Sequence, residues 1–409
     1  MLRRGALAGL AVSAVVLVAS AAASAREAKP DAGLTAGLKT RLARALSTPG
    51  IDPTRTGALA VDLETGQVVF QRNPSLALAP ASAEKLGVAF TALRVLGPAY
   101  RFETQVLATG EVRKRILYGN LHLVGAGDPT LDVSDLDALA RDLRSLGIRR
   151  VRGTVVGDEH HFDSQRGGRG WKPGFLGFEC APLSALSVED VRVRSVDGSA
   201  LAAAAAFTTA LERRGITVGH HSRTGRAPTD ALPLVSHGSA PLGAILRRMD
   251  RESNNFIAEM LLKEIGAAGA GRGSTAAGAA VVRTTLEQAG VPLDGVRIVD
   301  GSGLSTLDRA TPRELVRLLR AAERDPAIRS VFRSSLPVAG MSGTLKDRLD
   351  RRPTRGKIVA KTGTTSLASA LAGFVGERYV FAILQNGSPV AYWTARVAQD
   401  RFVTVLARS

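Results

Sequence analysis

The feature that most constrains this chain is a short polar turn, Pro80 to Lys85, followed directly by the apolar run Leu86–Leu96. The run predicts a buried helix that ends near Gly97. Ser82 and Lys85 lie three residues apart at its start, so both side chains lie on one face, one turn apart. A hydroxyl beside an amine can serve as a nucleophile with its base, but the same spacing also occurs by accident in many helices.

Arginine is the usual cation of this chain, because only nine of its 54 basic residues are lysine. A guanidinium stays charged, whereas burial and neighbouring charges can make a lysine give up its proton. Only Lys85 among the nine has a serine three positions earlier. The lysine at this position therefore indicates that the amine itself is required.

Residues 1–25 have the features of an export signal. Arg3 and Arg4 form a basic start, Leu7–Val18 an apolar stretch, and Ala23-Ser24-Ala25 a small-residue cleavage site. The same segment could remain as an uncleaved anchor, but its Ala-rich end favours cleavage after Ala25. We therefore expect an exported protein of the periplasm, the cell wall or the extracellular space. No later segment is apolar enough to span a bilayer.

The formal net charge of +17 favours polyanionic partners. Nucleic acid is not expected, because the chain carries an export signal and no basic run interleaved with aromatic residues. The charge instead predicts electrostatic contact with anionic cell-wall polymers or a membrane surface, and the alternative is a solvated Arg-rich surface. Cys180 is the only cysteine, which excludes an internal disulfide, and we interpret it as a small buried hydrophobic residue.

The pattern of apolar residues predicts one discontinuous domain, made of residues 26–99 and 241–409, whose sheet joins both ends of the chain. Helices are expected at 38–46, 242–265 (interrupted at 252–255), 312–323, 326–332 and 392–406, and strands at 57–62, 67–71, 358–362, 370–375 and 379–385. Residues 100–240 predict a separate inserted α+β domain. There we expect a strand at Val151–Val156 and one helix at Ser134–Leu146, with Ser134 as its N-cap.

Two further patterns follow the Ser82 motif in the chain. Ser253-Asn254-Asn255 has the Ser-x-Asn form at the break in a helical stretch, and Lys361-Thr362-Gly363-Thr364 ends a predicted strand. Each has a simpler explanation alone, as a helix cap and as a strand end. Ser-x-x-Lys, Ser-x-Asn and Lys-Thr-Gly in this order are the motifs of penicillin-binding proteins and serine β-lactamases.

The chain resembles the low-molecular-mass class C penicillin-binding proteins, which are D-alanyl-D-alanine carboxypeptidases and endopeptidases. Further family-like phrases begin at Gly127, Ser184, Asp300 and Gly343, and the long interval before Ser253 matches the family's inserted domain. The resemblance implies an α/β (α+β) transpeptidase fold of the penicillin-binding protein and β-lactamase type, with an antiparallel sheet flanked by helices. It also implies a peptidoglycan stem peptide ending in D-Ala-D-Ala as substrate, β-lactam antibiotics as covalent inhibitors, and no cofactor.

The resemblance also assigns roles. Ser82 would attack the penultimate D-alanine carbonyl, and Lys85 would take its proton if Lys361 and burial lower its pKa, although which group is the base stays open. Ser253 would relay the proton to the leaving D-alanine, and Asn255 would hold the substrate amide. The terminal carboxylate of the substrate would bind to Lys361, Thr362 and Thr364, with Gly363 in the same motif. The backbone N–H groups of Ser82 and Thr364 would form the oxyanion hole.

The chain departs from the family in two places, because the family usually has Asp where this chain has Asn254 and often Thr where it has Ala83. Neither change removes a residue that performs chemistry. Trp171 lies in a Gly-rich stretch where the family places aromatic residues of the stem-peptide pocket. Core packing is an equally good account of Trp171.

Three alternatives remain at this level. A β-lactamase or esterase on the same scaffold is disfavoured by the long insert and by the lack of an evident deacylating carboxylate. A non-catalytic wall-binding protein is disfavoured by the intact motifs. The polar stretch Asp158–His161 lacks His-Glu-x-x-His spacing, so a polar loop is a better interpretation than a metal site.

Overall fold

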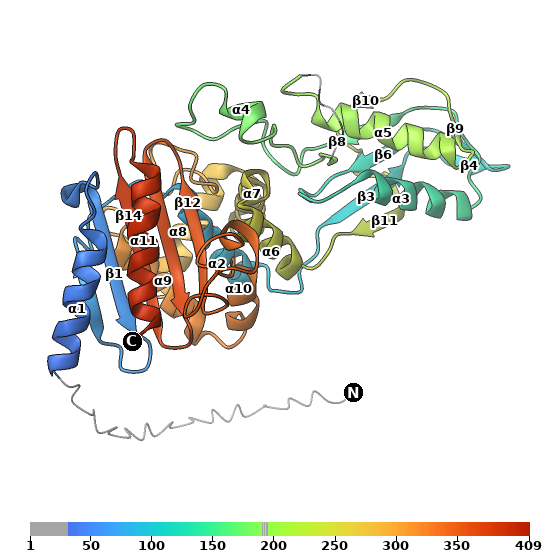
Figure 1. Cartoon of the computed structure of the whole chain (residues 1–409). Coiled ribbons are helices and arrows are strands. Elements are labelled where there is room, and N and C mark those ends of the chain that lie inside the picture. The colour runs from blue at the N-terminus through green and yellow to red at the C-terminus, as the bar shows by residue number, and fades with distance from the viewer. Residues whose placement is uncertain (1–31, 190, 192, 194) are drawn as a thin grey trace, which may run out of the picture.

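The computed structural model describes residues 32–189, 191, 193 and 195–409 of the chain. A central sheet of five antiparallel strands, in the order β12-β13-β14-β1-β2, joins the two ends of the chain, as predicted (Figure 1). Its strands are β1 (Thr56–Asp62), β2 (Val68–Arg72), β12 (Ile358–Thr364), β13 (Ala368–Val375) and β14 (Tyr379–Asn386).

Helices cover both faces of this sheet, and every residue of β13 is therefore buried. On one face, α1 (Ala32–Leu46) and α11 (Tyr392–Ala407) enclose a core that includes the edge-to-face pair Phe70 and Phe402. The helices of the other face share a second core. They are α2 (Lys85–Val95), α6 (Leu242–Glu252), α7 (Asn255–Ala270), α8 (Thr275–Gln288), α9 (Pro312–Arg324) and α10 (Arg329–Ser335).

Two smaller sheets take all their strands from residues 103–238 and lie to one side of the central sheet (Figure 1). The first has the order β10-β8-β6-β3-β11, and the second β4-β5-β7-β9. Their bounds are β3 (Glu103–Ala108), β4 (Glu111–Arg113), β5 (Ile116–Tyr118), β6 (Leu121–Val124), β7 (Arg150–Val151), β8 (Val155–Asp158), β9 (Thr217–Val218), β10 (Arg223–Thr224) and β11 (Leu232–Gly238). The helices here are α3 (Val133–Ser145), the short α4 (Phe175–Phe178) and α5 (Ser199–Arg213).

The predicted strand Val151–Val156 is wrong, because the chain changes sheets within it. Val151 belongs to β7 and pairs with β5, whereas β8 begins at Val155 and pairs with β6. Gly153 makes the crossing, where a Cβ atom would lie 2.2 Å from the Asn120 Oδ1 atom. Alternating apolar residues on both sides of this glycine looked like one strand in the sequence.

The predicted cap of the helix at Ser134 is also wrong. The cap is Asp132, whose Oδ1 atom accepts hydrogen bonds from the backbone N–H groups of Ser134 (2.7 Å) and Asp135 (3.0 Å). The Asp135 carboxylate accepts the Asp132 N–H in return at 3.0 Å, which completes a capping box. The insert also contains the Ala-rich helix α5, which the sequence analysis did not predict.

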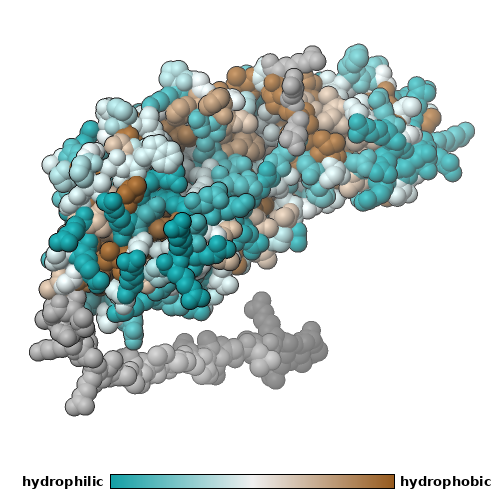
Figure 2. Space-filling view, viewed as in Figure 1, coloured by the Kyte–Doolittle hydropathy of each residue, from teal (hydrophilic) through white to brown (hydrophobic). Residues whose placement is uncertain are grey.

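The proposed export signal, residues 1–25, lies outside the described residues. Among the residues that are described, no helix is both long and apolar enough to cross a bilayer. The division into domains at residues 99 and 241 stays a prediction. Figure 2, seen from the same side, shows long hydrophilic side chains with a few hydrophobic patches over α1 and α11.

Candidate active site

Ser82 lies in a 3₁₀ turn, η2 (Ala81–Glu84), which leads directly into α2. Ala81 opens the turn in the left-handed region, with φ +47°. Ser82 is partly exposed, whereas Lys85, the first residue of α2, is fully buried. The Lys85 Nζ atom lies 2.9 Å from the Ser82 Oγ atom, so the turn brings hydroxyl and amine into hydrogen-bond contact.

Lys85 also connects Ser82 to two distant segments. Its ammonium group donates to the Asn255 Oδ1 atom at 2.8 Å and to the Ser302 carbonyl at 2.7 Å. The Asn255 amide in turn donates to the Glu179 carbonyl at 2.9 Å. An ammonium group has three protons, and the three acceptors around Lys85 use all of them.

The Ser-x-Asn segment is the predicted break between α6 and α7. Ser253 ends α6 with φ +57°, and the Asn254 Oδ1 atom caps α7 by accepting the Ile257 N–H at 3.0 Å. Because asparagine is as good an N-cap as aspartate, the departure from the family at Asn254 leaves this turn intact. The Lys361 ammonium group donates to the Ser253 Oγ atom at 2.9 Å, which brings the third motif to the first two.

The Lys-Thr-Gly motif ends the edge strand β12, which lies beside η2. A Cβ atom on Gly363 would lie 2.8 Å from the Pro80 carbonyl oxygen, so the glycine allows the strand to approach the turn that bears Ser82. Thr364 is exposed, and Thr362 donates through its hydroxyl to the Thr344 Oγ1 atom at 2.7 Å. The structure thus brings the three motifs together at one site.

Both buried lysines are shifted towards the neutral amine. Burial lowers the pKa of Lys85 to about 8, although the carboxyl groups of Asp300, Glu259 and Asp250 oppose the shift. Burial also lowers the pKa of Lys361 to about 7, with a further contribution from the charge of Lys85. Both amines therefore lose their protons at lower pH than a lysine in water, and Lys361 does so more readily than Lys85.

Two buried carboxyl groups that the sequence analysis missed hold the Asp300–Ser305 loop against Lys85. Glu259 accepts the N–H groups of Gly301 (3.0 Å) and Ser302 (2.8 Å), and Asp300 accepts that of Gly303 (2.7 Å). These bonds fix the Ser302 carbonyl that Lys85 contacts. Glu259 could have been found, because it is an acidic residue in the apolar stretch Phe256–Leu262, one helical turn after Asn255.

Trp171 lies beside this loop. Its Nε1–H donates to the Asp300 Oδ2 atom at 2.7 Å, and its ring packs on the small apolar cluster that contains buried Cys180. Cys180 is thus a buried apolar residue, as predicted. Trp171 has a packing role in the structure, and its proposed part in substrate binding stays a prediction.

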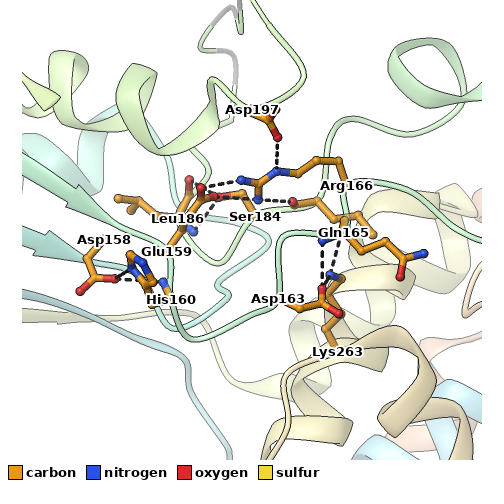
Figure 3. A network of polar contacts seen from close by, with 11 residues as sticks. Asp158, Glu159, His160, Asp163, Gln165, Arg166, Ser184, Leu186, Asp197 and Lys263 are labelled. Carbon is orange, nitrogen blue, oxygen red and sulfur yellow. Dashed lines mark hydrogen bonds and ion pairs between the residues drawn. The ribbon is translucent and has the colours of Figure 1, made fainter. Parts of the chain in front are cut away.

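The segment Asp158–His161 takes part in polar contacts between the insert and α7 (Figure 3). The His160 ring pairs with Asp158 at 2.8 Å, and Glu159 pairs with Arg166 at 2.6 Å. His161 contacts the Glu264 carboxylate of α7 at 2.7 Å. Buried Lys263, also of α7, pairs with Asp163. These side chains are engaged with protein partners, in keeping with the polar-loop interpretation.

Comparison with known proteins identifies the family. The model of the D-Ala-D-Ala carboxypeptidase 3 (S13) family matches residues 38–194 and 180–409. The chain belongs to the S13 family. It is 32% identical to the D-alanyl-D-alanine carboxypeptidase of Actinomadura sp. (strain R39), covering 84% of this chain and 79% of that protein. It is 31% identical to carboxypeptidase DacB of Mycolicibacterium smegmatis, covering 90% of this chain and 84% of that protein.

Solved structures support the same fold. Penicillin binding protein 4 from Haemophilus influenzae superposes with a TM-score of 0.79 at 24% identity, over 90% of this chain and 98% of that one. The expected penicillin-binding protein fold is therefore confirmed. As a member of the S13 family the protein is a serine peptidase.

The close approach of Gly303 to the turn that bears Ser82 gives a first prediction for this S13 peptidase. Gly303 has φ +80°, and a Cβ atom there would lie 1.9 Å from the Ala81 carbonyl oxygen. Gly290 has a similar φ of +72° with nothing within 4 Å of such an atom, so it is a matched control. We expect Gly290→Ala to lower the free energy of unfolding by about 1 kcal/mol, the conformational cost alone.

Gly303→Ala should lower the free energy of unfolding by at least about 3 kcal/mol, because the loop that carries Gly303 must also move away from the turn that carries Ser82. Denaturant unfolding measures both values. Penicillin acylation should slow in Gly303→Ala and stay unchanged in Gly290→Ala. Equal losses of stability in the two variants would show that the contact with Ala81 is unimportant.

The lysine pair gives a second prediction, on pH. In the roles that the resemblance assigns, Lys85 must be neutral to accept the Ser82 proton and Lys361 must be charged to bind a carboxylate, so the reactive form of the free enzyme keeps one proton on the two amines. The second-order rate constant of penicillin acylation should therefore rise with pH, pass through a maximum near the pKa values of about 7 for Lys361 and about 8 for Lys85, and fall at higher pH. Stopped-flow measurement of acylation checks this, and a rate that stays constant across the range would contradict it.

Proposed function

We propose that this protein is an exported serine D-Ala-D-Ala carboxypeptidase that removes the terminal D-alanine of peptidoglycan stem peptides through an acyl-enzyme on Ser82. β-Lactam antibiotics would acylate the same oxygen atom. The observation that carries the proposal is the position of the Lys85 Nζ atom, 2.9 Å from the Ser82 Oγ atom and 2.8 Å from the Asn255 Oδ1 atom. The Nζ atom of Lys361, on β12, lies 2.9 Å from the Ser253 Oγ atom.

Acylation would begin when the Ser82 Oγ atom attacks the carbonyl carbon of the penultimate D-alanine. Lys85 takes the hydroxyl proton as the new C–O bond forms. The C–N bond then breaks, and Lys85 passes this proton through the Ser253 hydroxyl, which contacts Lys361, to the leaving D-alanine amine, so that Lys85 is neutral again in the acyl-enzyme. Asn255 holds the substrate amide in line. The products of this step are free D-alanine and an ester on Ser82.

The terminal carboxylate would bind to Lys361, Thr362 and Thr364 at the end of β12. This anion favours the charged form of Lys361, so the amine that gives up its proton in the complex is Lys85. The backbone N–H groups of Ser82 and Thr364 would stabilise the oxyanion, a contribution of about 3 kcal/mol for each donor. Gly363 supports this arrangement, because it permits the close approach of β12 to η2.

Deacylation would use a water molecule and no cofactor. The water attacks the ester carbonyl, Lys85 accepts one of its protons, and the Ser82 Oγ atom leaves with a proton returned from Lys85. The shortened peptide is released as a carboxylic acid. The enzyme then has the protonation state with which it began.

Release of D-alanine from a peptide that ends in D-Ala-D-Ala tests the proposal. We expect one equivalent per peptide and no release from the same peptide ending in D-Ala-L-Ala. With penicillin, a peptidase of this kind forms a long-lived acyl-enzyme. Rapid turnover of penicillin would instead indicate a β-lactamase, and wall binding without any release would indicate a non-catalytic protein.

Export belongs to the same proposal and rests on the sequence of residues 1–25, with its basic start, apolar stretch and Ala23-Ser24-Ala25 site. The substrate is an extracytoplasmic polymer, which agrees with an exported enzyme. N-terminal sequencing of the protein recovered from its native compartment tests this. A mature chain beginning at Arg26 is the expected result.

A further inference from the structure

A groove with a volume of 570 Å³ runs between α1 and α11 on the outer side of the central sheet. Four arginines line it: Arg41 and Arg44 of α1, Arg401 of α11, and Arg408, which directly follows α11. None of the four forms an ion pair with a carboxylate of the described residues, and the one carboxylate in the lining, Asp400, is held by another arginine at 2.6 Å. The groove thus carries positive charge that the described part of the protein leaves unbalanced.

Large apolar side chains share this surface. Trp393 is 72% exposed and Val397 is 43% exposed, and both precede Arg401 on α11 at intervals of four residues. That spacing places the three side chains on one stripe of the helix. The Trp393 ring is braced by Arg396, whose guanidinium lies 5.2 Å from the ring centre. Figure 2 shows hydrophobic patches among long hydrophilic side chains on this face.

We propose that the face formed by α1 and α11 binds the surface of an anionic phospholipid bilayer. The arginines would contact lipid phosphate groups, and Trp393 and Val397 would enter the interfacial layer. Arginine beside an exposed indole is the combination found on helices that lie in a membrane interface. The proposal concerns attachment and does not depend on the proposed reaction.

A second arginine-lined hollow shows why a bilayer fits better than a soluble polyanion. It lies between α2 and α9 and is lined by arginines at 94, 317, 320 and 324, and none of the residues that line it is an exposed large apolar side chain. A phosphate polymer could bind either hollow by charge. Of these two surfaces, only the face of α1 and α11 also exposes Trp393 and Val397. A phosphate polymer would leave these two apolar side chains in water, whereas a bilayer would cover them.

The location is compatible with catalysis. α1 and α11 pack on one face of the central sheet, and α2, which carries Lys85, packs on the other. A bilayer bound at α1 and α11 would therefore leave the Ser82 side of the sheet free for peptidoglycan (Figure 1).

Co-sedimentation with phosphatidylcholine vesicles that contain phosphatidylglycerol tests the proposal. The double variant Arg401→Gln/Arg408→Gln should bind about thirtyfold more weakly than wild type, because each arginine near an anionic surface contributes about a fivefold factor. The matched control is Arg317→Gln/Arg324→Gln in the other hollow, which removes the same charge. It should change binding by no more than about twofold, because screening limits its reach.

Trp393→Ser should weaken binding while keeping the salt dependence of wild type, and the Arg401/Arg408 variant should show a weaker salt dependence. All variants keep the same N-terminal segment, so differences among them report this face, and unchanged penicillin acylation shows that each is folded. Equal losses for the two arginine pairs would overturn the proposal. So would complete displacement by soluble poly(glycerol phosphate), or a dimer that buries Trp393 in place of lipid.

Discussion

Ser82→Ala should reduce the release of D-alanine by about 10⁶-fold, because a serine peptidase without its nucleophile loses nearly all of its covalent catalysis. The change removes one partly exposed hydroxyl, so the fold should persist. The rate of D-alanine release by purified wild type and variant measures the effect. Thermal unfolding of both proteins checks that the loss is chemical.

Ser253→Ala is the matched control for this prediction. Ser253 is the other serine of the site, and its Oγ atom is 2.9 Å from Lys361. As a proton relay it should contribute a factor of about 10² to 10⁴, so this variant should still form an acyl-enzyme slowly. If Ser253→Ala blocked acylation and Ser82→Ala did not, the two assignments would have to be exchanged.

Lys85→Met and Lys85→Arg should each slow penicillin acylation by about 10²- to 10⁴-fold, the range typical for loss of a general base. Methionine fills the buried space without an amine. Arginine keeps the charge, but a guanidinium does not give up its proton at neutral pH. Stopped-flow acylation of both variants measures the effect.

Comparison of the two variants separates the roles of Lys85. A base is lost in both, whereas a fixed positive charge would be retained in Lys85→Arg. Near-normal acylation by a folded Lys85→Arg variant would therefore contradict a role in proton transfer. Lys361→Met provides the contrast, because loss of the cation that we propose binds the carboxylate should raise KM more than it lowers kcat.

The central part of the fold could be predicted from the sequence because its signals are local. Strand-like apolar runs at 57–62 and 67–71 predicted β1 and β2, and the break at Ser253-Asn254-Asn255 predicted the junction of α6 and α7. The three motifs could be assigned to one site because, in this order, they resemble the motifs of penicillin-binding proteins. Their hydrogen bonds then agree with that expectation.

The insert was harder to predict, because its helices and strands are short and the chain passes from one of its two sheets to the other. The segment from Val151 to Val156 looked like one strand, and only the packing around Gly153 shows that two sheets share it. The support of Lys85 by Glu259 and Asp300 was also missed. Those carboxylates act through backbone N–H groups of a loop far away in the sequence, and no local pattern records such contacts.

The central claim, that Ser82 is acylated because Lys85 activates it, is tested most directly by locating the adduct. The protein is treated with penicillin and digested, and the modified residue is found by mass spectrometry. We predict one penicilloyl group, on the Ser82 oxygen in the peptide that contains Pro80 to Lys85, and almost none in Lys85→Met after an exposure just long enough to label wild type. An adduct on any other residue, or full labelling of Ser82 in Lys85→Met, would contradict the account.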